Sequence, residues 1–317
     1  MRKSFLSISI FKIVFIAVII GAALTVTYGI LVTSKSVLYN AFALGKYLTM
    51  GPDVYGFPGS GGFLYTKPAL RSLVMPWRNT QNNLRTIQAL SDTLGRRGIK
   101  LIVVPVPDKE AILQTYSPFR AYNVGRQRMR MIAMLRKSNV DVIDLAGLFQ
   151  AAQKKDAVFN KEDHHWNDRG SMIAARVIAD SVNARLGVST AKARYSFKDT
   201  VVYEPGYTAM RLGDSSLYPR ACRIIMDSSG RPFKDSVWSD IMIFGDCFTS
   251  VNKAYGGGLG AGIAYFSNRP TFTISHFDPN PHAPAQMLNF LKNRKKEPKI
   301  ILWVFLSYFL SWQLDEF

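Results

Sequence analysis

The chain of 317 residues contains little of what metal and redox sites are commonly built from. It has two cysteines and four histidines. Two cysteines can form at most one disulfide, so disulfides are not the main support of the fold. No further cluster of His or Cys completes a zinc-ligand set, and we expect neither a metal site nor a soluble cofactor. The glycine run at 256–262 is not followed by the Gly-Lys-Ser/Thr of a phosphate-binding loop.

Acidic residues are also scarce. The sequence holds 22 Asp and Glu against 40 Lys and Arg, which gives a formal net charge of +18. A strongly basic chain attracts anionic partners. Because the N-terminal segment indicates an exported protein, we expect no nucleic-acid partner. An anionic polysaccharide or anionic lipid headgroups suit the charge better, and a basic surface with no dedicated partner is the alternative.

One apolar run is long enough to cross a membrane as a helix. Residues 11–33 include a single charged residue, Lys12, and Arg2 and Lys3 precede them. Basic residues on this side keep the N-terminal end in the cytoplasm. We therefore predict a single-pass anchor in the bacterial inner membrane, with the catalytic domain on the periplasmic or extracellular side. A cleaved signal peptide is the alternative, but the run is long for one and no Ala-x-Ala site follows it.

The domain organisation follows from this anchor. We predict a cytoplasmic tip and transmembrane anchor at 1–34, and a juxtamembrane stalk with a Gly/Pro-rich loop at 35–62. A globular domain occupies 63–317. Within it, residues 190–240 are polar, basic and rich in turns, so they are expected to form an insertion that shapes a substrate groove.

Apolar periodicity in the globular domain alternates between two kinds of element. Short apolar runs typical of buried strands alternate with longer stretches of helical spacing, which indicates an α/β fold with a doubly wound, mainly parallel sheet. The predicted strands are 99–104, 141–145, 241–244, 271–274 and 300–304. The predicted helices are 78–97, 126–137, 169–186 and 283–293.

Active sites of open α/β sheets form where loops leave the carboxyl ends of the strands, and two loops stand out. The first, at 162–170, reads Glu-Asp-His-His-Trp-Asn-Asp-Arg-Gly. Asp163 and His165 lie two residues apart in an extended loop, so the carboxylate can hold one imidazole nitrogen while the other faces a nucleophile. A zinc site that includes His164 and a purely structural histidine are the alternatives.

The second loop, Phe244–Asn252, follows a short buried strand. It contains Gly245-Asp246-Cys247-Phe248, and the turn into a following helix is expected to place Cys247 at a helix N-terminus. Gly245 begins this turn, and the backbone N–H groups of the turn can hold a developing oxyanion. A thiol beside an imidazole has a lowered pKa and is a competent nucleophile, whereas a small buried cysteine is the ordinary alternative.

These two loops carry a resemblance. A strand followed by Gly-Asp-Ser-Phe, together with an Asp-x-His-Trp loop, is similar to the SGNH hydrolases. The order here, with Asp163-His164-His165-Trp166 before the nucleophile loop, resembles the rearranged alginate O-acetyltransferase family and the related DHHW proteins. The stretch Val104–Lys109, of the form Val-Pro-x-Pro-x-Lys, adds to the resemblance, which covers about residues 50–310.

The resemblance implies roles for individual residues. Asp163 stands where the family has its triad acid, His165 where it has the base, and Cys247 where it has serine. Ser250, three residues further on, and Ser215, in a literal Gly-Asp-Ser, compete for the nucleophile role. We further expect three residues to contact substrate, namely Lys109, His164 and Trp166.

The function that these residues imply is a membrane-anchored O-acyltransferase. A nucleophile takes an acyl group, expected to be acetyl, from a multi-spanning membrane acyltransferase and passes it to an exported polysaccharide. An esterase with the same residues and water as acceptor is the second hypothesis. The third is a catalytically inactive polysaccharide-binding component of an export complex, because cysteine replaces serine at 247.

Overall fold

The computed structural model describes residues 55–71, 77–119, 125–192, 194–275, 283–292, 294 and 296–311, together with 45 and 49. The chain divides into two compact units, 1–49 with 119–122 and 50–118 with 123–317, and the second holds the fold described below. None of the helices in these ranges is long and apolar enough to cross a membrane. The anchor predicted at 11–33 lies outside the described residues.

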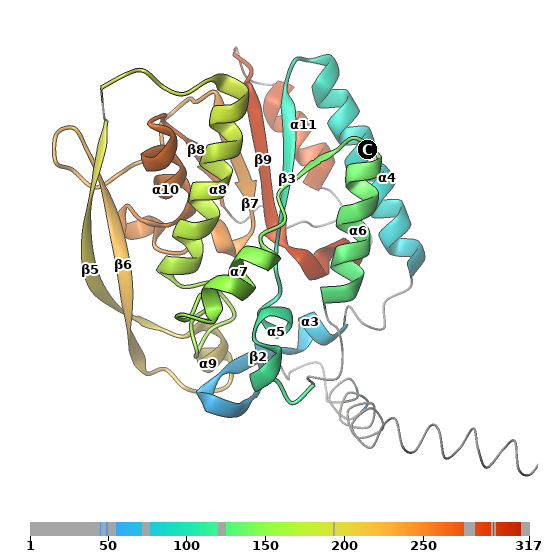
Figure 1. The fold of residues 1–317 in the computed structure, drawn as a ribbon, viewed down its shortest axis with the longest axis vertical. Coiled ribbons are helices and arrows are strands. Elements are labelled where there is room, and N and C mark those ends of the chain that lie inside the picture. The colour runs from blue at the N-terminus through green and yellow to red at the C-terminus, as the bar shows by residue number, and fades with distance from the viewer. Residues whose placement is uncertain are drawn as a thin grey trace, which may run out of the picture. The chain divides into compact units, whose positions relative to one another are not determined.

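A five-stranded sheet forms the centre of this second unit (Figure 1). Its strand order is β4-β3-β9-β7-β8, and every neighbouring pair is parallel. The predicted parallel sheet is therefore confirmed. The strands are β3 (Lys100–Val106), β4 (Asp141–Val142), β7 (Ile241–Gly245), β8 (Phe272–Ile274) and β9 (Ile300–Leu306).

Helices cover both faces of this sheet (Figure 1). Alternate residues of each strand point to opposite faces, so Leu101 and Val103 of β3 pack into one core cluster with α4, α6 and α11. On the other face, α10 packs beside Ile243 of β7 and against α8. The main helices are α4 (Trp77–Arg96), α6 (Gly125–Lys137), α7 (Ala146–Gln153), α8 (Asp168–Leu186), α10 (Gly258–Ser267) and α11 (Ala283–Lys292).

Helix α8 shows how the sequence fixes an element that borders the site. It begins after Asn167, whose side-chain oxygen accepts a hydrogen bond from the N–H of Gly170. It ends at Gly187, whose φ of 77° favours glycine. The residues predicted as a helix at 169–186 therefore lie in α8, and its cap fixes the point at which the preceding Asp-His-His-Trp loop joins the helix.

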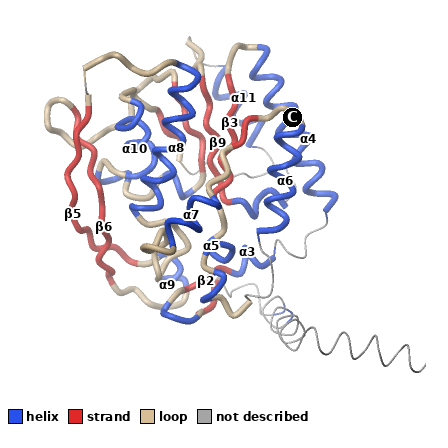
Figure 2. Tube along the Cα trace, viewed as in Figure 1, coloured by secondary structure: helices blue, strands red, loops and turns tan. Residues whose placement is uncertain are grey.

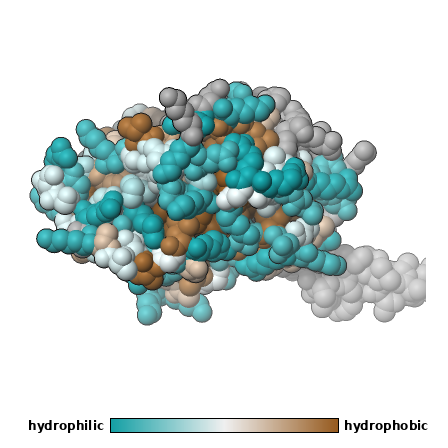
Figure 3. All heavy atoms as spheres, turned by 90° about the horizontal axis from the view of Figure 1, so that it is seen from above, coloured by the Kyte–Doolittle hydropathy of each residue, from teal (hydrophilic) through white to brown (hydrophobic). Residues whose placement is uncertain are grey.

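The polar segment 190–240 forms a long antiparallel hairpin beside the main sheet (Figure 2). Strand β5 (Tyr195–Pro205) pairs with β6 (Leu217–Asp227), and the short helix α9 (Tyr207–Arg211) lies in their connection. A smaller hairpin joins β1 (Gly56–Pro58) to β2 (Leu64–Thr66), and α3 (Lys67–Arg71) and α5 (Lys109–Ile112) follow β2 and β3. Hydrophilic side chains cover most of the face seen in Figure 3.

Candidate active site

The loop that carries Cys247 leaves the carboxyl end of β7 and is held by the residue before it. Asp246 is fully buried, and its Oδ1 accepts from the N–H of Phe248 at 3.0 Å while its Oδ2 accepts from the N–H of Leu306 at 2.7 Å. The carboxylate therefore joins the start of the turn to the end of β9. This bond fixes Cys247 at the same edge of the sheet as the loop after β3.

The turn after Cys247 differs from the predicted helix. It is a single 3-10 turn, η3 (Cys247–Thr249), followed by η4 (Lys253–Tyr255), and α10 starts only at Gly258. Asn252 takes a left-handed conformation with φ of 59°, which interrupts any continuous helix. A turn of this length has no helix dipole to offer, so the expected helix N-terminus at Cys247 is absent from this loop.

Asp163 is the hub of the site. Its Oδ1 lies 2.9 Å from Nδ1 of His165 and 3.2 Å from Nδ1 of His164, so a single carboxylate oxygen faces both imidazoles. Its Oδ2 accepts from the N–H of Tyr207 at 3.1 Å and lies 3.6 Å from Nη2 of Arg220. Burial by itself raises the pKa of this carboxyl, but His165 and the hydrogen bonds from both histidines hold it well below its usual range.

Both histidines turn towards Cys247. Nε2 of His164 lies 3.8 Å from the Cys247 Sγ, and one ring nitrogen of each histidine lies within 4.8 Å of that sulfur. The two rings lie against each other with centroids 3.9 Å apart and planes tilted by 35°. Among the described residues, the buried Nε2 of His165 has no hydrogen-bond partner. Burial, together with the neighbouring His165, lowers the pKa of His164 to about 4, so this imidazole is neutral near pH 7.

A cavity of about 500 Å³ lies in front of this constellation. Asp163, His164, His165, Cys247 and Ser250 all reach its wall. Asn252, from the same loop as Cys247, also lines the cavity. Segments far from both loops in the sequence supply further polar and aromatic side chains, which no local motif marks because they reach the cavity only when these segments pack together. They are Tyr55 before β1, Glu204, Tyr207 and Arg220 of the hairpin and its connection, and Tyr308 and Phe309 after β9.

Lys109 does not lie in an exposed loop, which corrects the expectation of a substrate contact. It is 1% exposed, on the first turn of α5, and Nζ donates to the carbonyls of Leu64, Asn160, Lys161 and Asp163 at 2.6–2.9 Å. Burial lowers the pKa of this ammonium, and nearby carboxylates oppose that shift. Lys109 thus holds the Asp-His-His-Trp loop from behind.

Trp166 likewise lies behind the site. It is fully buried and packs edge-on against Phe248, with ring centroids 5.2 Å apart, and against Phe149. Trp166 is not among the described residues that line the cavity. The prediction that Trp166 contacts substrate is therefore replaced by a packing role, because the indole supports the Phe248 ring that follows Cys247.

The alternative nucleophiles occupy different places. Ser250 lines the cavity, but its hydroxyl donates to the backbone carbonyl of Cys247 at 2.7 Å. Ser215 is exposed in the connection between the hairpin strands and is absent from the described cavity wall. Gly245 is buried at the end of β7, where a Cβ would meet the side chain of Thr249 and the carbonyl of Val304. Only glycine fits this close approach.

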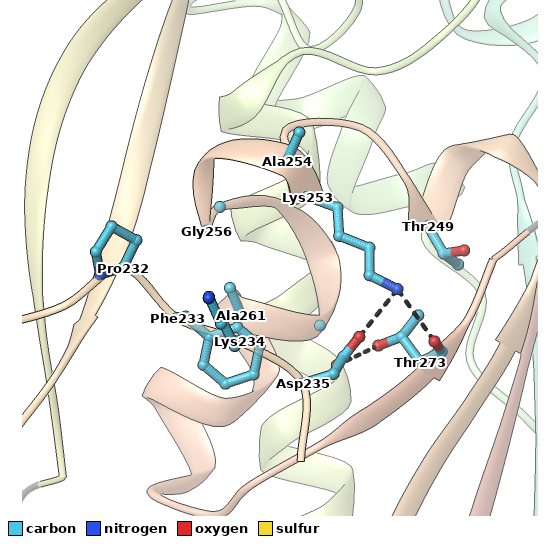
Figure 4. A pocket seen from close by; sticks show the side chains of 12 residues that line it. Pro232, Phe233, Lys234, Asp235, Thr249, Lys253, Ala254, Gly256, Ala261 and Thr273 are labelled. Atoms are coloured by element: carbon cyan, nitrogen blue, oxygen red, sulfur yellow. Dashed lines mark hydrogen bonds and ion pairs between the residues drawn. The ribbon is translucent and has the colours of Figure 1, made fainter. Parts of the chain in front are cut away.

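A second cavity, of about 320 Å³, lies on the other side of the same loop (Figure 4). The glycine run lines it, together with Phe233 and Thr273. Lys253 forms an ion pair with Asp235 at 2.9 Å and donates to the carbonyl of Thr273 at 3.1 Å. These contacts tie the turn after Cys247 to β8. The glycines therefore serve close backbone packing, in agreement with the lack of a phosphate-loop motif.

Comparison with known proteins identifies the family and the fold of the chain. Residues 57–218 match the family described as SGNH hydrolase-like domain, acetyltransferase AlgX. This half of the chain contains the Asp163–Trp166 loop and ends before Cys247. The probable alginate O-acetylase AlgJ of Pseudomonas putida is 29% identical over 112 residues, which are 32% of this chain and 27% of that protein. The chain thus matches about a quarter of the length of this curated relative.

Two solved structures share the fold. The O-acetyltransferase domain of Pseudomonas putida AlgJ superposes with a TM-score of 0.64 at 17% identity, covering 82% of this chain and 93% of that domain. Pseudomonas aeruginosa AlgX superposes with a TM-score of 0.60 at 18% identity, covering 81% of this chain and 66% of AlgX. At these identities the structures establish the fold alone.

Proposed function

The chain belongs to the SGNH hydrolase-like acetyltransferase family, and on that premise we propose that it is an O-acyltransferase that moves acetyl groups onto a polysaccharide. The observation that carries the proposal is the convergence of Cys247 with two histidines held by one carboxylate, at the wall of a cavity. This is the arrangement of an activated nucleophile, its base and the group that orients the base.

The proposed reaction has two steps. In the first, the Cys247 sulfur attacks the acyl carbon of a donor while its proton passes to Nε2 of His165, and the leaving group takes that proton as it departs. In the second, a sugar hydroxyl attacks the thioester, the same imidazole takes the hydroxyl proton, and the thiol is restored. Asp163 holds Nδ1 of His165 at 2.9 Å and stabilises the imidazolium. His164 contacts the sulfur at 3.8 Å and keeps it beside the base.

The setting of the enzyme is part of the same proposal. The apolar run at 11–33 anchors the chain in the inner membrane, and the domain faces the periplasm or the cell exterior. A multi-spanning membrane protein supplies the acyl group, and the acceptor is an exported polysaccharide. The net charge of +18 favours an anionic acceptor.

Intact-mass spectrometry of the purified chain after exposure to an activated acetyl ester tests the chemistry. We expect the mass gain of one acetyl group, lost in Cys247→Ala and in His165→Gln. Cys222→Ser is the matched control, because Cys222 is buried in the hairpin and is expected to leave the adduct unchanged.

Other outcomes would contradict parts of the proposal. An adduct that survives Cys247→Ala would assign the nucleophile to Ser250 or Ser215. Adduct loss in His164→Gln with retention in His165→Gln would exchange the roles of the two histidines. Release of the acetyl group to water in the presence of polysaccharide would identify an esterase, and complete inertness of the wild type would favour the binding component.

A further inference from the structure

Three side chains of the site have ligand atoms close enough to share one metal ion. Within the described residues, His164, His165 and Cys247 bring two nitrogens and a sulfur to within 4.8 Å of one another. In a tetrahedral site with Zn–S of about 2.3 Å and Zn–N of about 2.1 Å, sulfur and nitrogen stand about 3.6 Å apart. The 3.8 Å between Nε2 of His164 and the Cys247 Sγ is close to that separation.

The surroundings of the histidines suit metal binding as well. A histidine that ligates zinc through one nitrogen generally gives its other ring N–H to a carboxylate, which orients the ring. Asp163 Oδ1 faces Nδ1 of both rings, at 2.9 Å for His165 and 3.2 Å for His164. The Nε2 atoms are thereby left for a metal, and that of His165 is buried without a hydrogen-bond partner among the described residues.

Cysteine at 247 is what completes the ligand set. A thiolate is a strong zinc ligand, whereas a serine hydroxyl at the same place is a poor one. The sequence offered only the paired histidines, and it is the fold that brings the sulfur to them from a segment more than 80 residues further along. The cavity in front of the sulfur leaves room for water as a fourth ligand, the pattern of a zinc site with three protein ligands.

We infer that Zn²⁺ binds at His164, His165 and Cys247 and holds the enzyme inactive. On binding, the thiol gives up its proton to solvent, so that Cys–SH and Zn²⁺ become Cys–S–Zn⁺ and H⁺. The sulfur lone pair and the Nε2 lone pairs are then used in coordination, and the sulfur cannot attack an acyl carbon. Metal binding does not depend on the proposed function, but the inhibition rests on it.

Direct metal titration of the purified full chain tests the site without any acyl donor. Zn²⁺ is titrated against a chromophoric chelator, and Co²⁺ is used as a spectroscopic probe for thiolate-to-cobalt charge transfer. We expect one ion per chain and a thiolate band in the wild type. Cys247→Ser is expected to lose the band and to bind zinc more than about 100-fold less tightly than the wild type. Asp163→Asn, which removes a group that orients the ligands without binding the metal itself, is expected to weaken zinc binding by only about 10- to 100-fold.

The control variant is Cys222→Ser, which removes the second thiol of the chain and leaves that of Cys247. It is expected to bind zinc as tightly as the wild type does. Absence of stoichiometric binding by the wild type, or binding that is unchanged in both Cys247→Ser and His164→Gln, would overturn the inference. The acetyl-adduct assay is then repeated with zinc present, where loss of the adduct and its recovery with chelator are expected. Zinc binding without any acetyl adduct in metal-free protein would refute the proposed function alone, and an adduct without zinc binding would refute this inference alone.

Discussion

Lys109→Met is the substitution whose effect the structure defines best. The ammonium of Lys109 donates to four backbone carbonyls, and methionine keeps the length of the side chain without a donor. The carbonyl of Lys161 also accepts from the N–H of Leu64, so it retains a partner. The other three acceptors lose this donor, at a buried position for Asp163 and at partly buried positions for Leu64 and Asn160. At about 1 kcal/mol for each, the free energy of unfolding is expected to fall by about 3 kcal/mol.

The same substitution is expected to affect catalysis more than stability alone explains. One of the carbonyls belongs to Asp163, whose side chain orients both histidines. A displacement of about 1 Å in a catalytic group can reduce a rate about 100-fold. We therefore expect acetyl-adduct formation by Lys109→Met to slow at least about 10-fold under conditions where the variant is fully folded, as judged by circular dichroism.

Urea unfolding and the rate of adduct formation together check this reasoning. Lys161→Met is the matched control, since Lys161 is an exposed lysine on the same loop and is expected to differ from the wild type by less than about 0.5 kcal/mol. If Lys109→Met matched this control in both measurements, the four hydrogen bonds would not be holding the loop.

Two further predictions concern the frame of the site. Gly245→Ala is expected to lower the free energy of unfolding, measured by urea titration, by about 1–3 kcal/mol, because a Cβ at this position has no space. The control Gly147→Ala has open space in α7 and is expected to be neutral or stabilising. Equal effects of the two substitutions would refute the close approach of the Gly245 backbone to Thr249 and Val304. Burial raises the pKa of the Asp108 carboxyl to about 7, so the folded chain holds a proton that the unfolded chain releases above about pH 4. The wild type should therefore lose up to about 4 kcal/mol relative to Asp108→Asn as pH rises from about 4 to above 7, and parallel stability curves would contradict this.

The sequence by itself determined the parallel sheet and both loops of the site. Strands such as 241–245 and 300–306 are short, almost wholly apolar runs, and burial on both faces of a parallel sheet requires that composition. The caps of α8 are local as well, because Asn167 and Gly187 act within a few residues of the helix ends. The Asp-x-His spacing likewise predicted the contact of Asp163 with His165, since two residues in one loop cannot move far apart, whereas the contact of the same oxygen with His164 did not follow from it.

The tertiary structure decided what those loops contact. Lys109 lies behind the site because its ammonium is held by the carbonyls of Leu64 and the 160–163 segment, and no spacing in the sequence reveals this. Trp166 lies there because it packs between Phe149 and Phe248. Arg220 reaches Asp163 only because the hairpin folds back over the loop. Contacts between segments so far apart depend on how the elements pack, and local sequence patterns carry no information on that packing. For the same physical reason, the meeting of Cys247 with both histidines, on which the proposed chemistry and the zinc site depend, is a property of the fold.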